Sequence, residues 1–443
     1  MTSDGATGSG SSVFVWVWLP GATEPVVAGV LHPSGDDLQG EPVLLFRYAA
    51  SYRARPDAIS LFTPELPLTP ATFDPRRAAG RDPLPIAGAL RDAAPDAWGR
   101  RVVDARLRAR VGTRAGTHGW ADLDERTYLL ASGSDRIGAL DFQASPDRYV
   151  ARDDDADLHQ LLELTDLVER GETVPDSLTA AAAHGTSIGG ARPKALLRDG
   201  DRRVVAKFSS STDTRPVVQS EAVAMLLARR AGLQVPEVRV VRASGRSVLL
   251  VDRFDRVPVT RADGTTGHTR RQMVSMLTVL GLWEMNSRYA SYAQIADAIR
   301  TGPWTDVGAS LRELYGRLVL SVLVGNNDDH LRNHSAFWDG ARLTLTPAYD
   351  LAPQPRSSRT SSQAIGITRD GRRASQLWLV REAAADFLLP ATEADAIIDR
   401  VRGAVEDGWD DACDQALLTS TQRSALRGRE FGNPYVFEPE GTA

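Results

Sequence analysis

The stretch GNNDDHLRNH, from Gly325 to His334, gathers carboxylate, amide and imidazole side chains into one short segment. YGRLVLSVLV, which precedes it, is typical of a buried helix, and SAFW, which follows it, is typical of a buried strand. These flanks predict a polar loop that is held between elements of the hydrophobic core. The concentration of oxygen and nitrogen atoms indicates a site that performs chemistry.

The composition limits the classes of protein to consider. The chain has 443 residues, of which 42% are hydrophobic, and this suits a globular protein of two or three domains. The apolar run VFVWVWLP is far shorter than the roughly 20 residues of a membrane-spanning helix, and no basic residue precedes it, so we expect a cytoplasmic protein without a membrane partner. The single cysteine, Cys413, excludes an internal disulfide framework and a cysteine-based zinc site. The net charge of −5 argues against nucleic-acid binding over the whole surface.

Residues 1–12 are polar and rich in glycine, which predicts a disordered leader. Residues 13–150 are predicted to form an N-terminal β-rich subdomain with one basic helix. Its apolar runs VFVWVWLP, PVVAGVLH, PVLLFRY and AISLFTPEL are interrupted at intervals typical of a small barrel or sandwich. The helix, from Pro95 to Arg110, is expected to expose its arginines to solvent, with an acidic partner or nucleic acid as the alternative. These arginines are Arg100, Arg101, Arg106, Arg108 and Arg110.

The remaining chain is predicted to form two lobes. An acidic run that starts at Ala151 opens a new helix, with aspartates where they favour its N-terminus. We expect a nucleotide-binding lobe at residues 151–262. A mostly helical lobe at residues 263–443 would then contain the polar loop.

A glycine-rich turn, GTSIGGARPK, opens the first lobe and is followed by a strand, a DG hairpin and a second strand, RRVVAKF. Gly189 and Gly190, with Ser187 and Ile188 before them, would let backbone N–H groups approach a polyphosphate. The second strand ends by presenting Lys207 beside this turn. Taken alone, these residues favour an ordinary hairpin with a surface lysine.

The segment PVVQSEAVAMLLARRAGL predicts a helix, with Pro216 suited to its first turn and Gly232 to its C-terminal cap. Glu221 lies next to its apolar stripe, where a carboxylate needs a cation. A strand lysine followed by a helix glutamate is the pair that kinases use to hold the lysine against nucleotide phosphates, although a glutamate at the rim is the alternative. In VDRFDR, the backbone near Asp252 and Phe254 would suit an adenine edge.

The polar loop then fits a catalytic loop. Asp328 would accept or orient a substrate hydroxyl, and Asn333, five residues later, would bind magnesium together with Asp350 of TLTPAYDLAP. Magnesium prefers such hard oxygen ligands. His330 is expected to be a hydrogen-bonding residue of this nucleotide site. His330 and His334 could instead bind zinc, but the glutamate of an H-E-x-x-H motif is missing.

These segments together resemble the HipA-type serine/threonine kinases, the toxins of type II bacterial toxin–antitoxin pairs. The matching segments are DAAPDAWGR, SIGGARPK, VVAKF, SEAVAMLLA, VDRFDR, GNNDDHLRNHSAF and LTPAYDLAP. The resemblance implies an α+β fold with two protein-kinase-like lobes, an N-terminal β subdomain and a mostly helical C-terminal lobe. It also implies ATP binding by residues 187–194 and Lys207, catalysis by Asp328, magnesium at Asn333 and Asp350, and autophosphorylation of Ser187.

The resemblance further implies partners. They are a HipB-like helix-turn-helix antitoxin on a separate chain, operator DNA reached mainly through it, and a protein substrate such as an aminoacyl-tRNA synthetase.

The sequence departs from the family pattern at two places, because Asp329 replaces a glycine that the family often has and ARPK stands where AQEK is common. The alternative is a catalytically weak kinase fold that acts mainly as an antitoxin-bound transcriptional co-repressor. Retention of Lys207, Asp328, Asn333 and Asp350 favours the enzyme.

Overall fold

The computed structural model describes most of the chain. The described residues are 12–36, 40, 42–111, 123–152, 157–186, 190–210, 213–261, 264–355 and 358–441. Apart from Ser12, the predicted leader lies outside them. Ser187, Ile188 and Gly189 of the predicted phosphate-binding turn also lie outside them, so the roles of these three residues stay predictions.

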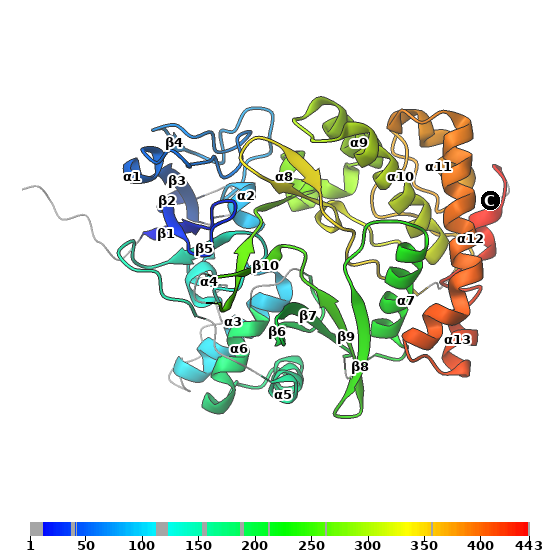
Figure 1. Cartoon of the computed structure of the whole chain (residues 1–443), viewed down its shortest axis with the longest axis horizontal. Coiled ribbons are helices and arrows are strands. Elements are labelled where there is room, and N and C mark those ends of the chain that lie inside the picture. The colour runs from blue at the N-terminus through cyan, green and yellow to red at the C-terminus, as the bar shows by residue number, and fades with distance from the viewer. Residues whose placement is uncertain are drawn as a thin grey trace, which may run out of the picture.

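The N-terminal subdomain is built on one open antiparallel sheet with the strand order β4-β3-β2-β1-β5 (Figure 1). Its strands are β1 (Val13–Val17), β2 (Val26–Asp36), β3 (Pro42–Tyr48), β4 (Thr72–Phe73) and β5 (Leu140–Gln143). The predicted barrel or sandwich is therefore wrong. The apolar face of the sheet is covered by residues of the short helices α2 (Gly88–Arg91) and α4 (Glu125–Ala131) instead of a second sheet.

The fourth predicted strand, AISLFTPEL, is a buried loop that follows helix α1 (Ala50–Arg53). Side chains satisfy its backbone in place of a strand ladder. The Leu61 N–H donates to the Tyr48 hydroxyl at 2.8 Å, and that hydroxyl donates to the Leu66 carbonyl at 2.7 Å. Its apolar residues pack into the core of the N-terminal sheet without adding a strand to it.

The first kinase-like lobe contains a second antiparallel sheet, with the order β6-β7-β9-β8. Its strands are β6 (Lys194–Asp199), β7 (Arg202–Phe208), β8 (Val238–Ala243) and β9 (Arg246–Asp252). Alternate residues face opposite sides of a strand, so Ala206 and Leu250 pack against α3 (Ala97–Val111), α5 (Leu158–Glu169) and α6 (Thr179–Gly185). Leu249 and Val251 face the other way, toward α7 (Val217–Arg230).

The basic helix α3 packs its apolar face against this lobe, and Arg101 is exposed as predicted. Trp98 and Val102 lie in the same core cluster as the β6–β9 sheet. Arg100 forms an ion pair with Glu125, and Arg106 donates to the carbonyl of Ala131. Two of the five arginines are thus committed to holding the neighbouring helix α4, while the side chains of Arg108 and Arg110 lie outside the described residues.

The C-terminal lobe is mostly helical. Its helices are α8 (Met276–Val279), α9 (Tyr292–Thr301), α10 (Val307–Val324), α11 (Leu377–Glu382), α12 (Ala391–Gln415) and α13 (Ser420–Leu426). A small sheet joins β12 (Met273–Ser275), β13 (Ser335–Trp338) and β14 (Leu343–Leu345). Helix α10 is buried along its second half, and α7 packs against α12, so one core cluster runs through both lobes.

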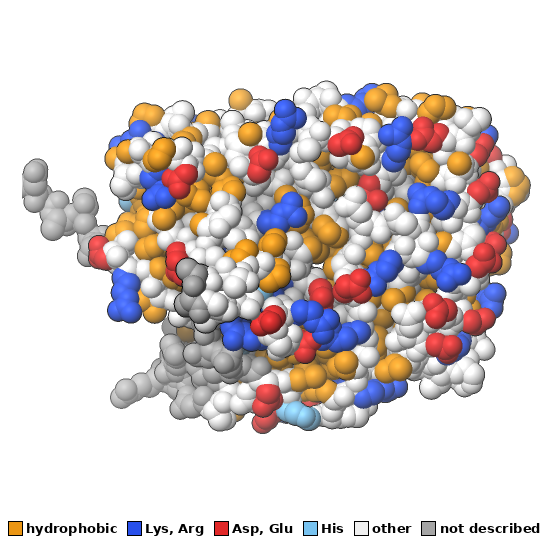
Figure 2. Space-filling view, viewed as in Figure 1, with side chains coloured by type: hydrophobic (Ala, Val, Ile, Leu, Met, Phe, Trp, Pro, Cys, Tyr) orange, Lys and Arg blue, Asp and Glu red, His pale blue; other side chains and the backbone are white. Residues whose placement is uncertain are grey.

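Short elements complete the two lobes. A hairpin of β10 (Arg256–Thr260) and β11 (Thr266–Arg270) spans the predicted boundary at residue 262. Single 3-10 turns occur at η2 (Asp176–Leu178), η3 (Glu284–Tyr289), η4 (Leu331–Asn333), η5 (Ala383–Phe387) and η6 (Pro434–Phe437). In the space-filling view, acidic and basic side chains are interspersed over the visible face (Figure 2). Within the described residues, no helix is both long and apolar enough to cross a membrane.

Candidate active site

The candidate site is organised around the ammonium group of Lys207. Because Lys207 alternates with inward-facing Ala206 on β7, its side chain points to the sheet face that α7 covers. There Nζ forms an ion pair with Glu221 of α7 and donates to Asp350 Oδ1 at 2.6 Å. The predicted strand lysine and helix glutamate therefore meet, and the predicted aspartate of the distant turn joins them.

The three charged groups of this triad are buried or half-buried, and they shift one another's pKa values. Burial opposes the charged form of Lys207, but Asp350 and Glu221 outweigh it and raise the lysine pKa. Burial also opposes the carboxylate of Asp350, yet Lys207 and Lys194 hold the pKa of Asp350 well below its usual range. Burial and the neighbouring Asp350 carboxylate raise the pKa of Glu221, against the attraction of Lys207. Asp350 has a φ of 58°, a strained left-handed conformation for a residue with a side chain.

A second lysine and a further carboxylate belong to the same environment. Lys194 pairs directly with Lys207 across β6 and β7, is 4% exposed, and has a pKa lowered mainly by burial. A Cβ on Gly190 would lie 2.2 Å from Lys194 Nζ, so only glycine allows this approach. Burial raises the pKa of Asp96 to about 6, although Lys194 opposes the shift. Sequence reasoning missed Asp96, whose only signal was its place in DAAPDAWGR.

The loop that carries Asp328 begins where α10 ends. Gly325 closes the helix with a φ of 69°, and a Cβ there would lie 2.7 Å from the carbonyl oxygen of Glu430. Asp328 is exposed to solvent. Its pKa is raised, first by partial burial of the carboxylate and also by the like charges of Asp350 and Asp329, while His330 opposes the shift. Asp328 is thus the accessible carboxylate of the loop.

Asn333 lies buried one turn further along. Its Nδ2 donates to the Asp328 carbonyl oxygen at 3.2 Å, and its backbone N–H donates to the His330 carbonyl. Within the described part of the chain, the side-chain oxygen of Asn333 accepts no hydrogen bond. Among the described residues, no three His, Cys, Asp or Glu side chains form a cluster that could hold a metal ion.

Asp329, the residue that replaces the family's glycine, lies at the centre of a buried polar network. The Ser321 hydroxyl donates to Asp329 Oδ2 at 3.0 Å, the Tyr292 hydroxyl donates to the same oxygen, and His334 Nε2 lies 3.0 Å from Oδ1. Burial would raise the pKa of Asp329, but His334, Tyr292 and Ser321 outweigh it and lower that pKa. One side chain therefore joins α9, α10 and the loop beyond Asp328.

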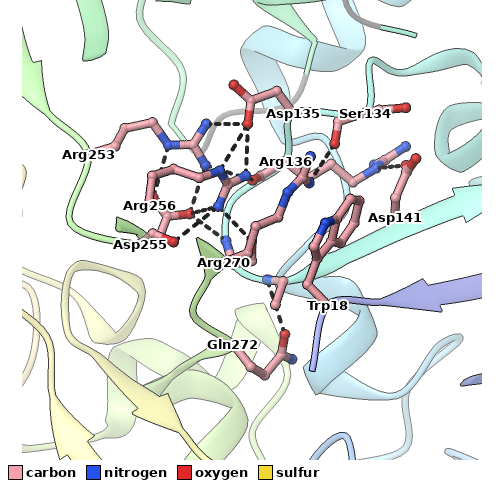
Figure 3. A network of polar contacts seen from close by, with 12 residues as sticks. Trp18, Ser134, Asp135, Arg136, Asp141, Arg253, Asp255, Arg256, Arg270 and Gln272 are labelled. Atoms are coloured by element: carbon pink, nitrogen blue, oxygen red, sulfur yellow. Dashed lines mark hydrogen bonds and ion pairs between the residues drawn. The ribbon is translucent and has the colours of Figure 1, made fainter. Parts of the chain in front are cut away.

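The segment VDRFDR is held by a buried network of arginines and aspartates (Figure 3). Arg253 donates to Asp255 at 2.7 and 2.9 Å and to Asp135 at 2.8 Å. Arg256 donates to the same two carboxylates at 2.8 Å. Asp135 lies between α4 and β5, so the N-terminal subdomain fixes the chain where it leaves the β6–β9 sheet.

The other predicted nucleotide residues lie around this centre. Phe254 packs its ring 5.8 Å from that of Tyr349, next to Asp350. The Asp252 carboxylate at the end of β9 lies 3.8 Å from Arg202 of β7 and 3.7 Å from Arg239 of β8. His330 is close enough to Asp328 and Asp350 to lower the pKa of each carboxyl group. The structure thus brings together Lys207, Glu221 and Asp350. Asp328 and His330 of the polar loop lie close enough to Asp350 for their charges to interact with it.

Comparison with known protein families identifies the lineage of the chain. The family model of the HipA-like C-terminal domain matches residues 186–409, slightly more than half of the sequence. The chain belongs to this HipA-like family. The matched residues extend into α12 and include both the Lys207 triad and the polar loop.

Two curated relatives come from Sinorhizobium fredii, and both carry names of candidate kinases. Y4mE is 29% identical over 155 residues, which cover 33% of this chain and 33% of the relative. Y4dM is 28% identical over 207 residues, which cover 43% of this chain and 47% of the relative. The matches thus span less than half of the length of these two relatives.

The fold matches a solved structure over nearly its whole length. That structure is HipA of Shewanella oneidensis MR-1 in a toxin–antitoxin complex with HipB and operator DNA. The TM-score is 0.63 at 16% sequence identity, and the match covers 93% of this chain and 94% of the solved chain. The predicted HipA-type, two-lobed α+β fold is confirmed.

Proposed function

We propose that the chain is a kinase that transfers the γ-phosphoryl group of ATP to a protein hydroxyl, with magnesium as the cofactor. The observation that carries this proposal is the triad in which Lys207 contacts both Glu221 and Asp350. Asp328 is exposed and lies close enough to Asp350 for the negative charge of Asp350 to raise the pKa of Asp328. Phosphoryl transfer needs this combination of a fixed cation, a metal-binding carboxylate and an accessible acceptor for a proton.

The donor set fits magnesium. Asp350 offers a carboxylate that its low pKa keeps ionised, and Asn333 offers an amide oxygen whose partner nitrogen is already bonded. These are hard oxygen donors of the kind that Mg²⁺ takes together with water and phosphate oxygens. When bound, Mg²⁺ would supply positive charge that neutralises the phosphate oxygens during transfer.

Side chains of the candidate site would bind the phosphates, position Lys207 and accept the hydroxyl proton. Lys207 and Lys194 would bind phosphate oxygens, and Glu221 would keep Lys207 in place. The substrate hydroxyl oxygen forms a bond to the γ-phosphorus while the bond from that phosphorus to the bridging oxygen breaks and its electron pair leaves with ADP. Asp328 would take the hydroxyl proton, and its raised pKa suits a group that must hold a proton during the reaction.

We further propose that the chain acts as a toxin, with a HipB-like antitoxin as partner and operator DNA bound mainly through that antitoxin. The likeness of the fold to HipA, solved with HipB and operator DNA, supports this partner. Serine or threonine as the acceptor, a translation component such as an aminoacyl-tRNA synthetase as the substrate, and autophosphorylation of Ser187 are parts of the same proposal.

Phosphoproteomics after induced expression tests the proposal. We expect new phosphoserine or phosphothreonine sites with the wild-type chain and their loss with Asp328→Ala, because a positioned base contributes on the order of 10² to 10⁴ in rate. Equal phosphorylation by both proteins would refute the role of Asp328. Antitoxin binding without phosphorylation by either would instead favour a co-repressor.

A further inference from the structure

A hollow of about 710 Å³ lies away from the candidate active site, between the two lobes. It is bounded by residues 209–210, 213–216 and 219, by the β8–β9 turn, and by α13 with the residues that follow it. Figure 1 shows the β8–β9 hairpin, α7 and α13 near one another on the lower right side of the molecule. Neither Lys207, Asp328 nor Asp350 lines this hollow.

Arginine dominates the charge of the lining. Its basic residues are Arg215, Arg242, Arg246 and Arg429. The two acidic residues are already neutralised, because Asp213 contacts Arg192 at 3.0 Å and Glu430 contacts Arg215 at 2.8 Å. The lining therefore has an excess of positive charge that the protein itself does not balance.

Two of the guanidinium groups are available to a ligand. Arg242 and Arg429 are exposed, and within the described part of the chain neither side chain makes a hydrogen bond or ion pair. Arg246 is held in position by Asp166 at 2.7 and 3.0 Å. Thr214 and Thr421 add hydroxyl groups to the lining. The site thus combines a fixed arginine with two arginines that have donors to spare.

We propose that this hollow binds a phosphate monoester dianion, either on a protein side chain or as a free compound. A guanidinium group presents a planar fork of donors that matches phosphate oxygens, and several such groups suit two negative charges. The volume is within the range of small-ligand sites, and a concave site favours a compact phosphate over the backbone of a nucleic-acid duplex. The proposal does not depend on kinase activity.

Binding measurements on the full chain without nucleotide test the proposal. The probes are a fluorescein-labelled heptapeptide with one phosphoserine, its unphosphorylated form, O-phospho-L-serine and inorganic phosphate. The test variant is Arg242→Ala with Arg429→Ala, and the matched control is Arg47→Ala with Arg148→Ala, which removes two exposed arginines elsewhere. We expect the phosphopeptide to bind the wild type and the control equally, and to bind the test variant at least about tenfold more weakly, because charge-assisted hydrogen bonds are lost.

The outcomes distinguish a phosphorylated protein from a free phosphate monoester, and distinguish this hollow from the candidate active site and from a nucleic-acid surface. Binding of the phosphopeptide far above O-phospho-L-serine assigns the site to phosphorylated protein, whereas equal binding assigns it to free phosphate monoesters. Equal affinity of the test variant and the wild type overturns the proposal, as does equal binding of the unphosphorylated peptide. Loss of phosphopeptide binding in Lys207→Met places the phosphate in the candidate active site and also overturns it. Binding only of a labelled 20-base-pair duplex, weakened in the test variant, replaces it with a nucleic-acid surface.

Discussion

Substitution of Asp329 by alanine should destabilise the chain strongly, although this residue is adjacent to the exposed Asp328. The change leaves the hydroxyls of Tyr292 and Ser321 without Oδ2, their shared acceptor in a buried site, and removes the carboxylate that lies beside the His334 ring. Each buried polar group left unpaired costs about 1–3 kcal/mol. The structure around them can relax in part, so we expect the free energy of unfolding to fall by about 3–5 kcal/mol.

Urea denaturation near neutral pH, followed by tryptophan fluorescence, measures this loss. The pKa of Asp329 is lower in the folded chain than in the unfolded chain, where it is about 4. The ionised carboxylate therefore stabilises the fold fully at a pH above the unfolded-state pKa. This stabilisation is lost as the pH falls through the folded-state pKa. The difference in the free energy of unfolding between wild type and variant should therefore be constant from pH 6 to 8, because this range lies above the unfolded-state pKa of about 4. Asp328→Ala is the matched control, because an exposed side chain should change stability by only about 0.5 kcal/mol. A loss below about 1 kcal/mol for Asp329→Ala, or an equal loss for the two variants, would refute this account of the network.

Two further substitutions test other parts of the site. Glu221→Gln keeps the shape of the side chain but removes a charge from Lys207, so kinase activity should fall by roughly tenfold or more, as measured by ATP turnover, and full activity would contradict the role of the pair. Gly325→Ala should lower the free energy of unfolding by at least about 1–3 kcal/mol, because its φ is 69° and its new Cβ would lie 2.7 Å from the Glu430 carbonyl oxygen. Gly403→Ala in α12 is its control and should be neutral or stabilising by up to about 1 kcal/mol, since nothing lies within 4 Å of the added Cβ.

Local patterns predicted the parts of the site that belong to regular elements. Helix α7 begins next to Pro216, and the chain turns with a positive φ at Gly232, as proline and glycine at these positions indicated. The order of a strand lysine and a helix glutamate, which is the kinase pattern, predicted the contact between Lys207 and Glu221, whereas the strand alone favoured a surface lysine. The role of Asp350 in this site was predicted from the order of motifs along kinase sequences, because 143 residues separate Asp350 from Lys207 and no local pattern links them.

Other features depend on tertiary contacts that no local pattern encodes. AISLFTPEL has the composition of a strand, but bonds to the Tyr48 hydroxyl hold it as a loop. Arg100 and Arg106 of the basic helix look solvated by spacing alone, yet they bind residues of α4 that lie about 25 positions away. Asp329 appeared only as a departure from the family, because its partners on α9 and α10 are distant in sequence.

Transfer of the labelled γ-phosphate of ATP by the purified full-length chain tests the central claim most directly. The reaction is followed with and without Mg²⁺ for wild type, Asp328→Ala and Lys207→Met, and the label in protein serine and threonine is measured over time. We predict Mg²⁺-dependent labelling by the wild type that falls by on the order of 10² or more in Asp328→Ala, while that variant still unfolds like the wild type. Labelling of protein by Asp328→Ala at the wild-type rate would contradict the assignment of Asp328 as the group that accepts the hydroxyl proton.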